Sequence, residues 1–149
     1  MKQWFALVWL AFALDVQGRP PLFVHYMPWF QAKPFNATWG YHWTLDRFNP
    51  DLVDANGRRD IGSHYYPLIG PYDSLDPAVL EYHVVLMKLG GIDGVIPDWY
   101  GNTDFWDYAM INQRMTELFK WTRRAGLQFA VCYEDQTVLH MLKNNFITP

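Results

Sequence analysis

Three short apolar runs, separated by two helical stretches, constrain the fold of this chain more than any other feature. The runs cover residues 22–27, 92–97 and 127–133, and each is rich in residues that suit β-strands. None alternates cleanly between apolar and polar residues, which is typical of strands buried on both faces of a parallel sheet. The sequence therefore predicts an α/β protein with a parallel sheet.

Helices are predicted over residues 77–89 and 105–125, and a further helix begins near Thr137. Asp76 is a candidate N-cap of the first helix, and Asp104 of the second. The first helix is expected to bury a stripe at helical spacing, namely Val79, Tyr82, Leu86 and Leu89. The second is expected to bury Ile111, Met115, Leu118, Phe119 and Thr122.

The order of strands and helices fits either a doubly wound sheet or a (β/α)8 TIM barrel. No glycine-rich phosphate-binding segment follows the first strand, where the sequence has residues 25–29 (HYMPW) instead, and this favours the barrel. A whole barrel needs about 250 residues. Residues 19–149 are therefore expected to be the truncated N-terminal part of a barrel domain, roughly its first three βα units. The alternative is a small three-layer domain that is complete as it stands.

The first 18 residues resemble an export signal. Lys2 precedes an apolar run over residues 4–14, which is too short to span a bilayer. A buried N-terminal element is the alternative. We expect a secreted or periplasmic protein that has no membrane association once residues 1–18 are removed. Cys132 is the single cysteine, so no disulfide can form within the chain, and we expect it to pack as a small apolar residue.

The charge balance argues against nucleic acid as a partner. The chain has 12 Lys and Arg residues against 15 Asp and Glu residues, a formal net charge of −3. Proteins that bind nucleic acid usually present a basic face. The five histidines stand at positions 25, 42, 64, 83 and 140, in neither the His-x-His nor the His-Glu-x-x-His spacing. We therefore assign no metal ligands, and a metal-dependent hydrolase is the less favoured alternative.

Aromatic and acidic side chains follow each predicted strand, at the end where barrel enzymes carry their active sites. The first strand ends in His25 and Tyr26, with Trp29 just beyond. Asp98, Trp99 and Tyr100 follow the second strand, and Glu134 follows the third. The long loop over residues 28–75 adds His42 and Trp43. We expect this loop to be ordered and to form one wall of a cleft.

Rings beside carboxylates suit a carbohydrate, because sugars offer apolar faces for stacking and hydroxyl groups for hydrogen bonds. Glycoside cleavage ordinarily needs two carboxyl groups. Glu134 is the best candidate, since burial at a strand end can raise a carboxyl pKa towards acid–base use. Other interpretations stay open: Glu134 as a buried hydrogen-bonding residue, Asp98 as a turn cap, and Trp29 and Trp43 as packing residues of the loop.

Several segments together resemble glycoside hydrolase family 99 and its family 71/99-like bacterial relatives. These are residues 25–30 (HYMPWF), 40–43 (GYHW), 65–74 (YYPLIGPYDS), 91–95 (GIDGV) and 98–101 (DWYG). The match runs from about residue 22 to the end of the chain, and its most specific part is residues 65–74. Any one segment alone would be weak.

The resemblance implies a (β/α)8 barrel and an endo-acting hydrolase that cleaves α-mannosidic bonds of an oligosaccharide or polysaccharide such as mannan, with retention of configuration and without a cofactor. It implies that Glu134 acts as the base that lets the sugar 2-hydroxyl attack the anomeric carbon. It also implies a subsite shaped by Trp99 and Tyr100 with Tyr26 beside them. Trp29, His42, Trp43 and Asp98 complete the expected substrate-binding set.

Two departures from the family pattern bear on this expectation. Asp135 and Gln136 follow Glu134, where the family usually has proline and tyrosine. The family's general acid comes from a later segment rich in tryptophan and glutamate, which this sequence does not contain. We therefore expect the 149-residue chain alone to be inactive. A non-catalytic carbohydrate-binding protein that uses the same aromatic rim is the alternative, and the sequence gives no oligomeric state.

Overall fold

The computed structural model describes residues 18–148, and the expected export signal therefore lies outside the described residues except for Gly18. The elements, in chain order, are β1 (Phe23–Tyr26), α2 (Tyr41–Thr44), α3 (Pro77–Leu89), β2 (Gly94–Trp99), α4 (Tyr108–Arg124), β3 (Gln128–Phe129), β4 (Cys132–Tyr133) and α5 (Gln136–Lys143). Among these helices, none is long and apolar enough to cross a membrane.

The strands form a parallel sheet with β2 in the middle. β1 pairs with one edge of β2, and β3 and β4 pair in succession with the other. The third expected strand is thus interrupted at residues 130–131, although the amide of Ala130 still donates to the carbonyl oxygen of Val95 at 3.0 Å. The described residues form an open sheet with two unpaired edges, so the closed barrel stays a prediction.

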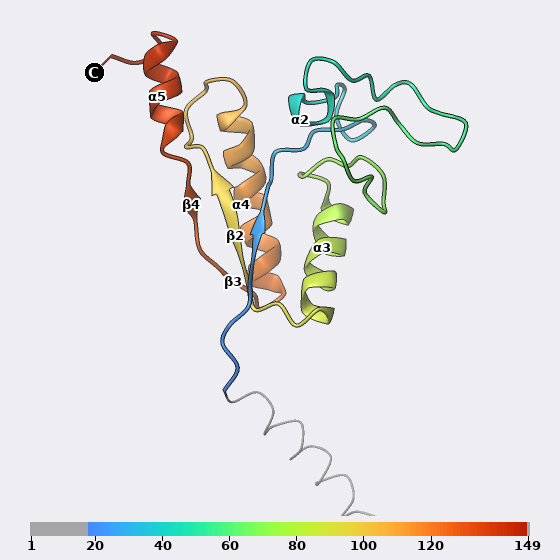
Figure 1. The fold of residues 1–149 in the computed structure, drawn as a ribbon. Helices are drawn as coiled ribbons and strands as arrows, with labels where there is room; N and C mark the ends of the chain where they lie inside the picture. Colours follow the sequence, from blue (N-terminus) through green and yellow to red (C-terminus); the bar gives the residue numbers. More distant parts are fainter. Residues whose placement is uncertain (1–17, 149) are drawn as a thin grey trace, which may run out of the picture.

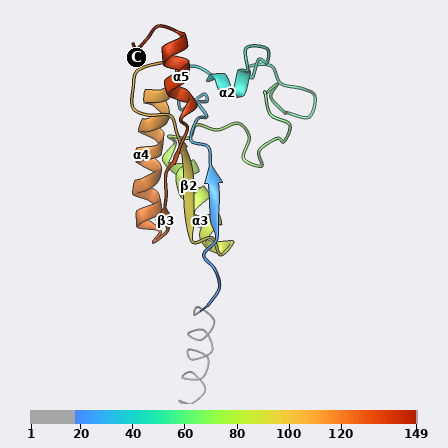
Figure 2. The same cartoon turned by 60° about the vertical axis from the view of Figure 1, so that its left-hand side comes forward.

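Helices α3 and α4 lie on the same face of this sheet (Figures 1 and 2). Because side chains alternate along a strand, Val24, Tyr26 and Val95 point to the helices. The core of the molecule lies there and also contains Leu80, Val84, Met87, Leu118 and Leu127. Burial on both faces was expected for all three strands, but β3 is exposed and His25 of β1 is exposed, and both strands lie at the ends of the sheet.

Helix α3 has the expected bounds, and the carboxylate of Asp76 caps it by accepting from the amide of Ala78 at 2.9 Å. Its expected buried stripe is wrong. Leu80, Val84 and Met87 face the core, whereas Leu86 and Leu89 are exposed. Apolar residues occur all round this helix, so their spacing does not select the side that packs on the sheet.

Helix α4 begins three residues later than expected, after Asp107 rather than Asp104. Trp106 has a φ of 50°, in the left-handed region that a bulky residue rarely adopts, and this ends the preceding turn before the helix starts. Four of the five residues expected to be buried on this helix are buried, namely Ile111, Met115, Leu118 and Thr122, while Phe119 is half-buried.

The long loop over residues 28–75 has a core of its own. Trp43 is 1% exposed, packs with Ala32 and Ile61, and donates from its indole nitrogen to the carbonyl oxygen of Tyr72 at 2.9 Å. The rings of Phe30, Trp39, Tyr66 and Tyr72 pack around this cluster. The loop is ordered, as its aromatic content predicts.

One buried ion pair fastens this loop to the helices. The Asp73 carboxylate accepts from the Arg114 guanidinium of α4 at 3.2 and 3.3 Å, and from the amides of Ala32 and Leu75 at 3.0 and 2.8 Å. Both charged side chains are almost wholly buried. A buried charge is tolerated only when it is paired and hydrogen-bonded, so each residue depends on the other.

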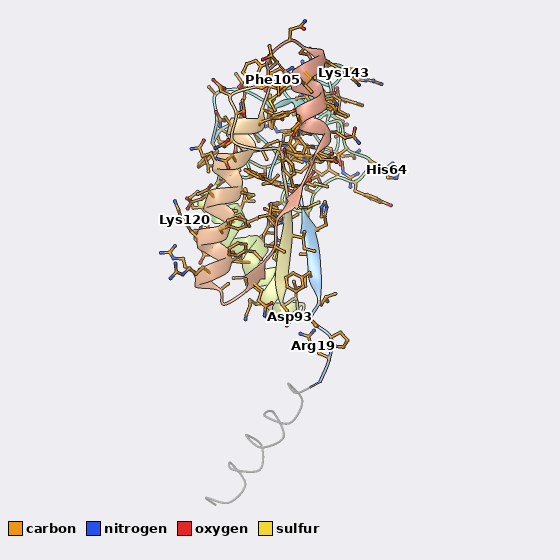
Figure 3. The ribbon with its side chains drawn as sticks, turned by 90° about the vertical axis from the view of Figure 1, so that its left-hand side faces the viewer. Arg19, His64, Asp93, Phe105, Lys120 and Lys143 are labelled. Carbon is orange, nitrogen blue, oxygen red and sulfur yellow. The ribbon has the colours of Figure 1, made fainter. Side chains whose placement is uncertain are left out.

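At the opposite end of the sheet, an ion pair between Arg19 and Asp93 holds the chain where it enters β1. Arg19 donates to both carboxylate oxygens of Asp93 at 2.8 and 2.9 Å, and the amide of Leu22 donates to the same carboxylate at 2.7 Å. Figure 3 shows Arg19 and Asp93 together at this end, far from Phe105 at the other.

We predict that Asp73→Asn destabilises the protein by about 3–5 kcal/mol, because Arg114 would keep its charge in a buried site without a counter-charge. The free energy of unfolding measured in urea would show the loss. Glu117→Gln, which removes an exposed partner of Lys120, is the control and should cost about 0–1 kcal/mol. Equal losses in the two variants would contradict this role of Asp73.

We expect His83 to make the stability depend on pH. Its ring is partly buried among Tyr26, Tyr72 and Tyr82, and burial lowers its pKa below the ordinary value. A lowered pKa gives stability that is complete above about pH 6.5 and is lost as the pH falls through the folded-state pKa. We predict that the thermal midpoint of His83→Gln falls less than that of the unmodified chain between pH 7.5 and about pH 5, while the exposed His64→Gln behaves like the unmodified chain.

Candidate functional site

A cavity of about 730 Å³ opens at the carboxyl ends of the strands. This size is within the range of small-ligand sites. It is lined from three directions: the loop with Tyr41, His42 and Asp46, the segment after β2 with Tyr100, Trp106, Asp107 and Tyr108, and the segment after β4 with Glu134, Gln136, Thr137 and His140. The sequence placed three of these residues, His42, Tyr100 and Glu134, at a common site.

His42 is held in a fixed orientation. Its ring stacks on Trp29 with a centroid distance of 4.3 Å and an interplanar angle of 5°. Its Nε2 lies 3.0 Å from the carboxylate of Asp107, which accepts a hydrogen bond from it. Trp29 thus lies behind the cavity wall, and its own buried indole nitrogen has no hydrogen-bond partner within residues 18–148.

Tyr100 connects the loop to the start of α4. Its ring packs edge-to-face against Tyr108 at 5.3 Å and against Trp29 at 6.4 Å. Burial raises its pKa, and the nearby negative charges of Asp98, Asp107 and Glu134 raise it further. Tyr100 also lines the cavity, where its hydroxyl oxygen can accept a hydrogen bond.

The backbone of Glu134 is fixed on both sides. Its amide donates to the carbonyl oxygen of Trp99 at 3.0 Å, and its own carbonyl oxygen accepts from the hydroxyl of Thr137 at 2.7 Å. Its carboxylate accepts only a long hydrogen bond of 3.4 Å from the amide of Gln136 among the described residues. Most of the hydrogen-bonding capacity of this carboxylate is therefore available at the cavity wall.

Asp98 is a second carboxyl group close to Glu134, and it is 6% exposed. Burial raises its pKa, and the charge of Glu134 adds to this, whereas His25 and hydrogen bonds from Cys132 and Tyr100 act in the opposite direction. Asp98 lies behind the cavity and does not line it.

Three of the expected substrate-binding residues lie elsewhere. The Tyr26 hydroxyl is 2.9 Å from Nδ1 of His83, on the helix side of the sheet. Trp99 donates from its indole nitrogen to Asn112 of α4 at 3.0 Å, and Trp43 lies inside the loop core. The reason is alternation along the strand: the helix-facing positions include residues 26 and 99. Val24 and Val95 face the helices, and counting every second residue from them along each strand would have placed Tyr26 and Trp99 on the same side.

The sequence missed the part of the cavity formed by the start of α4 and by α5. Trp106, Asp107 and Tyr108 were expected inside a helix, and His140 was assigned no role. The hydroxyl of Tyr108 lies 3.4 Å from Nδ1 of His140, so these two elements meet at the cavity. The one signal that could have found them is the aromatic run Phe105–Trp106 directly after the second strand's loop.

Structural comparison finds solved structures with the same parallel βα arrangement. Two solved structures of the GH99 endo-alpha-mannosidase from Bacteroides thetaiotaomicron match the fold with TM-scores of 0.56 and 0.56, at 20% and 19% sequence identity. They cover 81% of this chain in both cases, and 34% and 37% of the enzyme. At this level of identity the match shows the fold alone.

Sequence comparison gives named relatives. The chain is 33% identical over 100 residues to glycoprotein endo-alpha-1,2-mannosidase of Rattus norvegicus, and 28% identical over 101 residues to that of Xenopus laevis. These matches cover 58% and 60% of this chain but 21% and 22% of the relatives. No family model matches the chain. The resemblance to glycoside hydrolase family 99 is confirmed, and the chain spans about a fifth of the length of these curated relatives.

We predict that Trp29 and His42 stabilise each other by about 0.5–1.5 kcal/mol, the usual value for a stacked ring pair. A double-mutant cycle with Trp29→Leu and His42→Leu measures this coupling from the free energies of unfolding. The same cycle on Trp29 and the exposed Tyr65 is the control and should give no coupling. Additive losses at Trp29 and His42 would show that the stack does not hold the cavity wall.

Proposed function

We propose that this chain forms part of a glycoside hydrolase that acts on α-mannosides and that the cavity at the strand ends receives the sugar. The observation that carries the proposal is the Glu134 carboxylate, which lies in the cavity wall with unused hydrogen-bonding capacity, opposite rings supplied by the loop. The similarity to endo-alpha-1,2-mannosidases supports mannose as the sugar.

The lining suits a pyranose ring. Tyr41 and Trp106 are 55% and 65% exposed and offer flat apolar surfaces on which a sugar face can stack. Glu134, His42 and Tyr100 supply the polar groups that hydroxyls need. A few polar groups among apolar and aromatic side chains are the usual composition of a small-ligand site.

The proposed reaction is endo-acting and retains the anomeric configuration. Glu134 accepts the proton of the sugar 2-hydroxyl as its oxygen attacks the anomeric carbon. The bond from that oxygen to the anomeric carbon forms while the glycosidic bond breaks, and the leaving oxygen receives a proton from a general acid. Water then attacks the anomeric carbon of the epoxide-like intermediate from the face opposite the bridging oxygen and gives its proton to the conjugate base of the general acid. Glu134 returns its proton to the 2-oxygen as the epoxide opens. The family resemblance assigns the general acid to a later segment rich in tryptophan and glutamate, so we propose that the 149-residue chain binds its sugar without cleaving it.

We further propose that the protein is exported from the cell, with residues 1–18 as the signal. The names of the relatives, which are glycoprotein endo-alpha-1,2-mannosidases, support this proposal. The second candidate function is a carbohydrate-binding protein without catalysis. The exposed rings of Tyr41 and Trp106 favour it, since a platform for stacking suffices for binding.

Binding of α-1,2-mannobiose to the 149-residue chain, followed by calorimetry, tests the proposed function. Glu134→Gln should raise the dissociation constant about tenfold or more, because hydrogen bonds to a charged group contribute about 1.5–3 kcal/mol. Glu117→Gln, on α4 and outside the cavity lining, is the matched control and should bind as the unmodified chain does.

Equal binding by Glu134→Gln and Glu117→Gln would overturn the role of Glu134. Tighter binding of cellobiose than of mannobiose would overturn the proposed sugar. Hydrolysis separates the two candidate functions: a longer form of the protein that binds mannobiose but never releases mannose from an α-mannan supports the binding protein.

A further inference from the structure

We infer that the face of the sheet opposite the helices carries a binding site for a zinc-type cation, formed by His25, Asp98 and Cys132. One ligand atom from each residue, namely an imidazole nitrogen, a carboxylate oxygen and the thiol sulfur, lies within 4.8 Å of the other two. The residues come from β1, β2 and β4. They lie beside the sugar cavity without lining it.

The parallel pairing of the strands brings these side chains together. Asp98 and Cys132 are directly paired across β2 and β4, and His25 is paired with Ile96, two residues before Asp98 on the same face of β2. The intervening residues Tyr26 and Trp99 point to the helices instead. The three candidate ligands are therefore positioned by backbone hydrogen bonds of the sheet, and not by the flexible ends of surface side chains.

The three donor atoms are those that zinc prefers. Zn²⁺ binds histidine nitrogen, cysteine sulfur and carboxylate oxygen at about 2.0–2.3 Å in a tetrahedral arrangement, which sets the ligand atoms roughly 3.3–3.8 Å apart. Since the ligand atoms lie within 4.8 Å of one another, the site must contract by at most about 1–1.5 Å, within the reach of small side-chain rotations. Three protein ligands leave a fourth position for water, as in open zinc sites.

Burial and charge fit an ion that enters from one side. Asp98 is buried, Cys132 is half-buried and His25 is exposed, so the open side of the site is the one that His25 lines. The thiol of Cys132 lies within 4.8 Å of the carboxylate of Asp98. A bound cation would replace the thiol proton and hold both groups as anions. The nearby charge of Glu134 would add to the attraction.

Sequence patterns could not show this site. The ligands belong to three strands that are far apart along the chain, so no short spacing such as Cys-x-x-Cys connects them. The sequence predicted only a packing role for Cys132, because its neighbours along the chain are apolar. Those neighbours do not show which residues lie beside it in the sheet. The inference does not depend on the proposed function, because it concerns residues outside the cavity and is tested without sugar.

The test uses the reduced, chelator-treated 149-residue chain titrated with Zn²⁺ and with Co²⁺ as a spectroscopic probe. We expect one equivalent of Zn²⁺ to bind. Co²⁺ should give the intense visible bands of tetrahedral coordination together with a thiolate charge-transfer band. Cys132→Ser should abolish the charge-transfer band, and Asp98→Asn should weaken Zn²⁺ binding about tenfold or more, as expected when a ligand of a metal site is lost. His64→Gln, an exposed histidine outside the site, should change neither.

The site would be disproved by a Co²⁺ spectrum without a thiolate band, or by Zn²⁺ affinity that is the same in the unmodified chain, Cys132→Ser and Asp98→Asn. Circular dichroism of the metal-free variants checks that each is folded. If Cys132→Ser fails to fold, the Co²⁺ spectrum of the unmodified chain decides, because the chain has a single cysteine and a thiolate band can come from no other residue.

Discussion

The buried pair of Asp73 and Arg114 is the interaction on which the rest of the structure depends. It joins a loop of nearly fifty residues to α4, and the same carboxylate also receives the amides of Ala32 and Leu75 and the side chain of Asn36. Removing either charge would leave the other buried without a counter-charge. The loop is therefore fixed to the βα layers by this ion pair, and ring contacts such as that of Tyr72 with His83 of α3 add to the attachment.

This attachment determines what the cavity can be. His42 belongs to the loop, while Asp107 and Tyr100 belong to the segment after β2, and the three meet only if the loop is held against the strand ends. The ring of Trp29 behind His42 removes the remaining freedom of the imidazole. A binding wall supplied by a long loop can thus be as well ordered as one built from helices.

The sequence was sufficient for the features that depend on local chemistry. The alternation of apolar runs with helices predicted the parallel sheet, and the Asp76–Pro77 pair predicted the start of α3. The aromatic and acidic residues after each strand predicted where a cavity would open. These features follow from backbone hydrogen bonding, capping and burial, all of which act over a few residues.

Features that depend on side-chain direction could not be predicted in the same way. The apolar positions of α3 do not show which side meets the sheet, and the run from Tyr26 to Trp29 does not show that Tyr26 turns to His83. The positive φ of Trp106, which delays α4, has no signature in a non-glycine residue. The pairing of Asp98 with Cys132 required the register of two strands that meet only in the fold.

The ion pair between Arg19 and Asp93 has a consequence for how the protein could be processed. The carboxylate of Asp93 accepts hydrogen bonds from the guanidinium of Arg19 and from the amide of Leu22, so the chain is held in place just before β1 begins. A peptidase that cut after Gly18 would leave Arg19 as the new amino terminus with its side-chain contacts intact. The mature chain would then begin at a fastened end, with only a few residues between the cleavage point and the sheet.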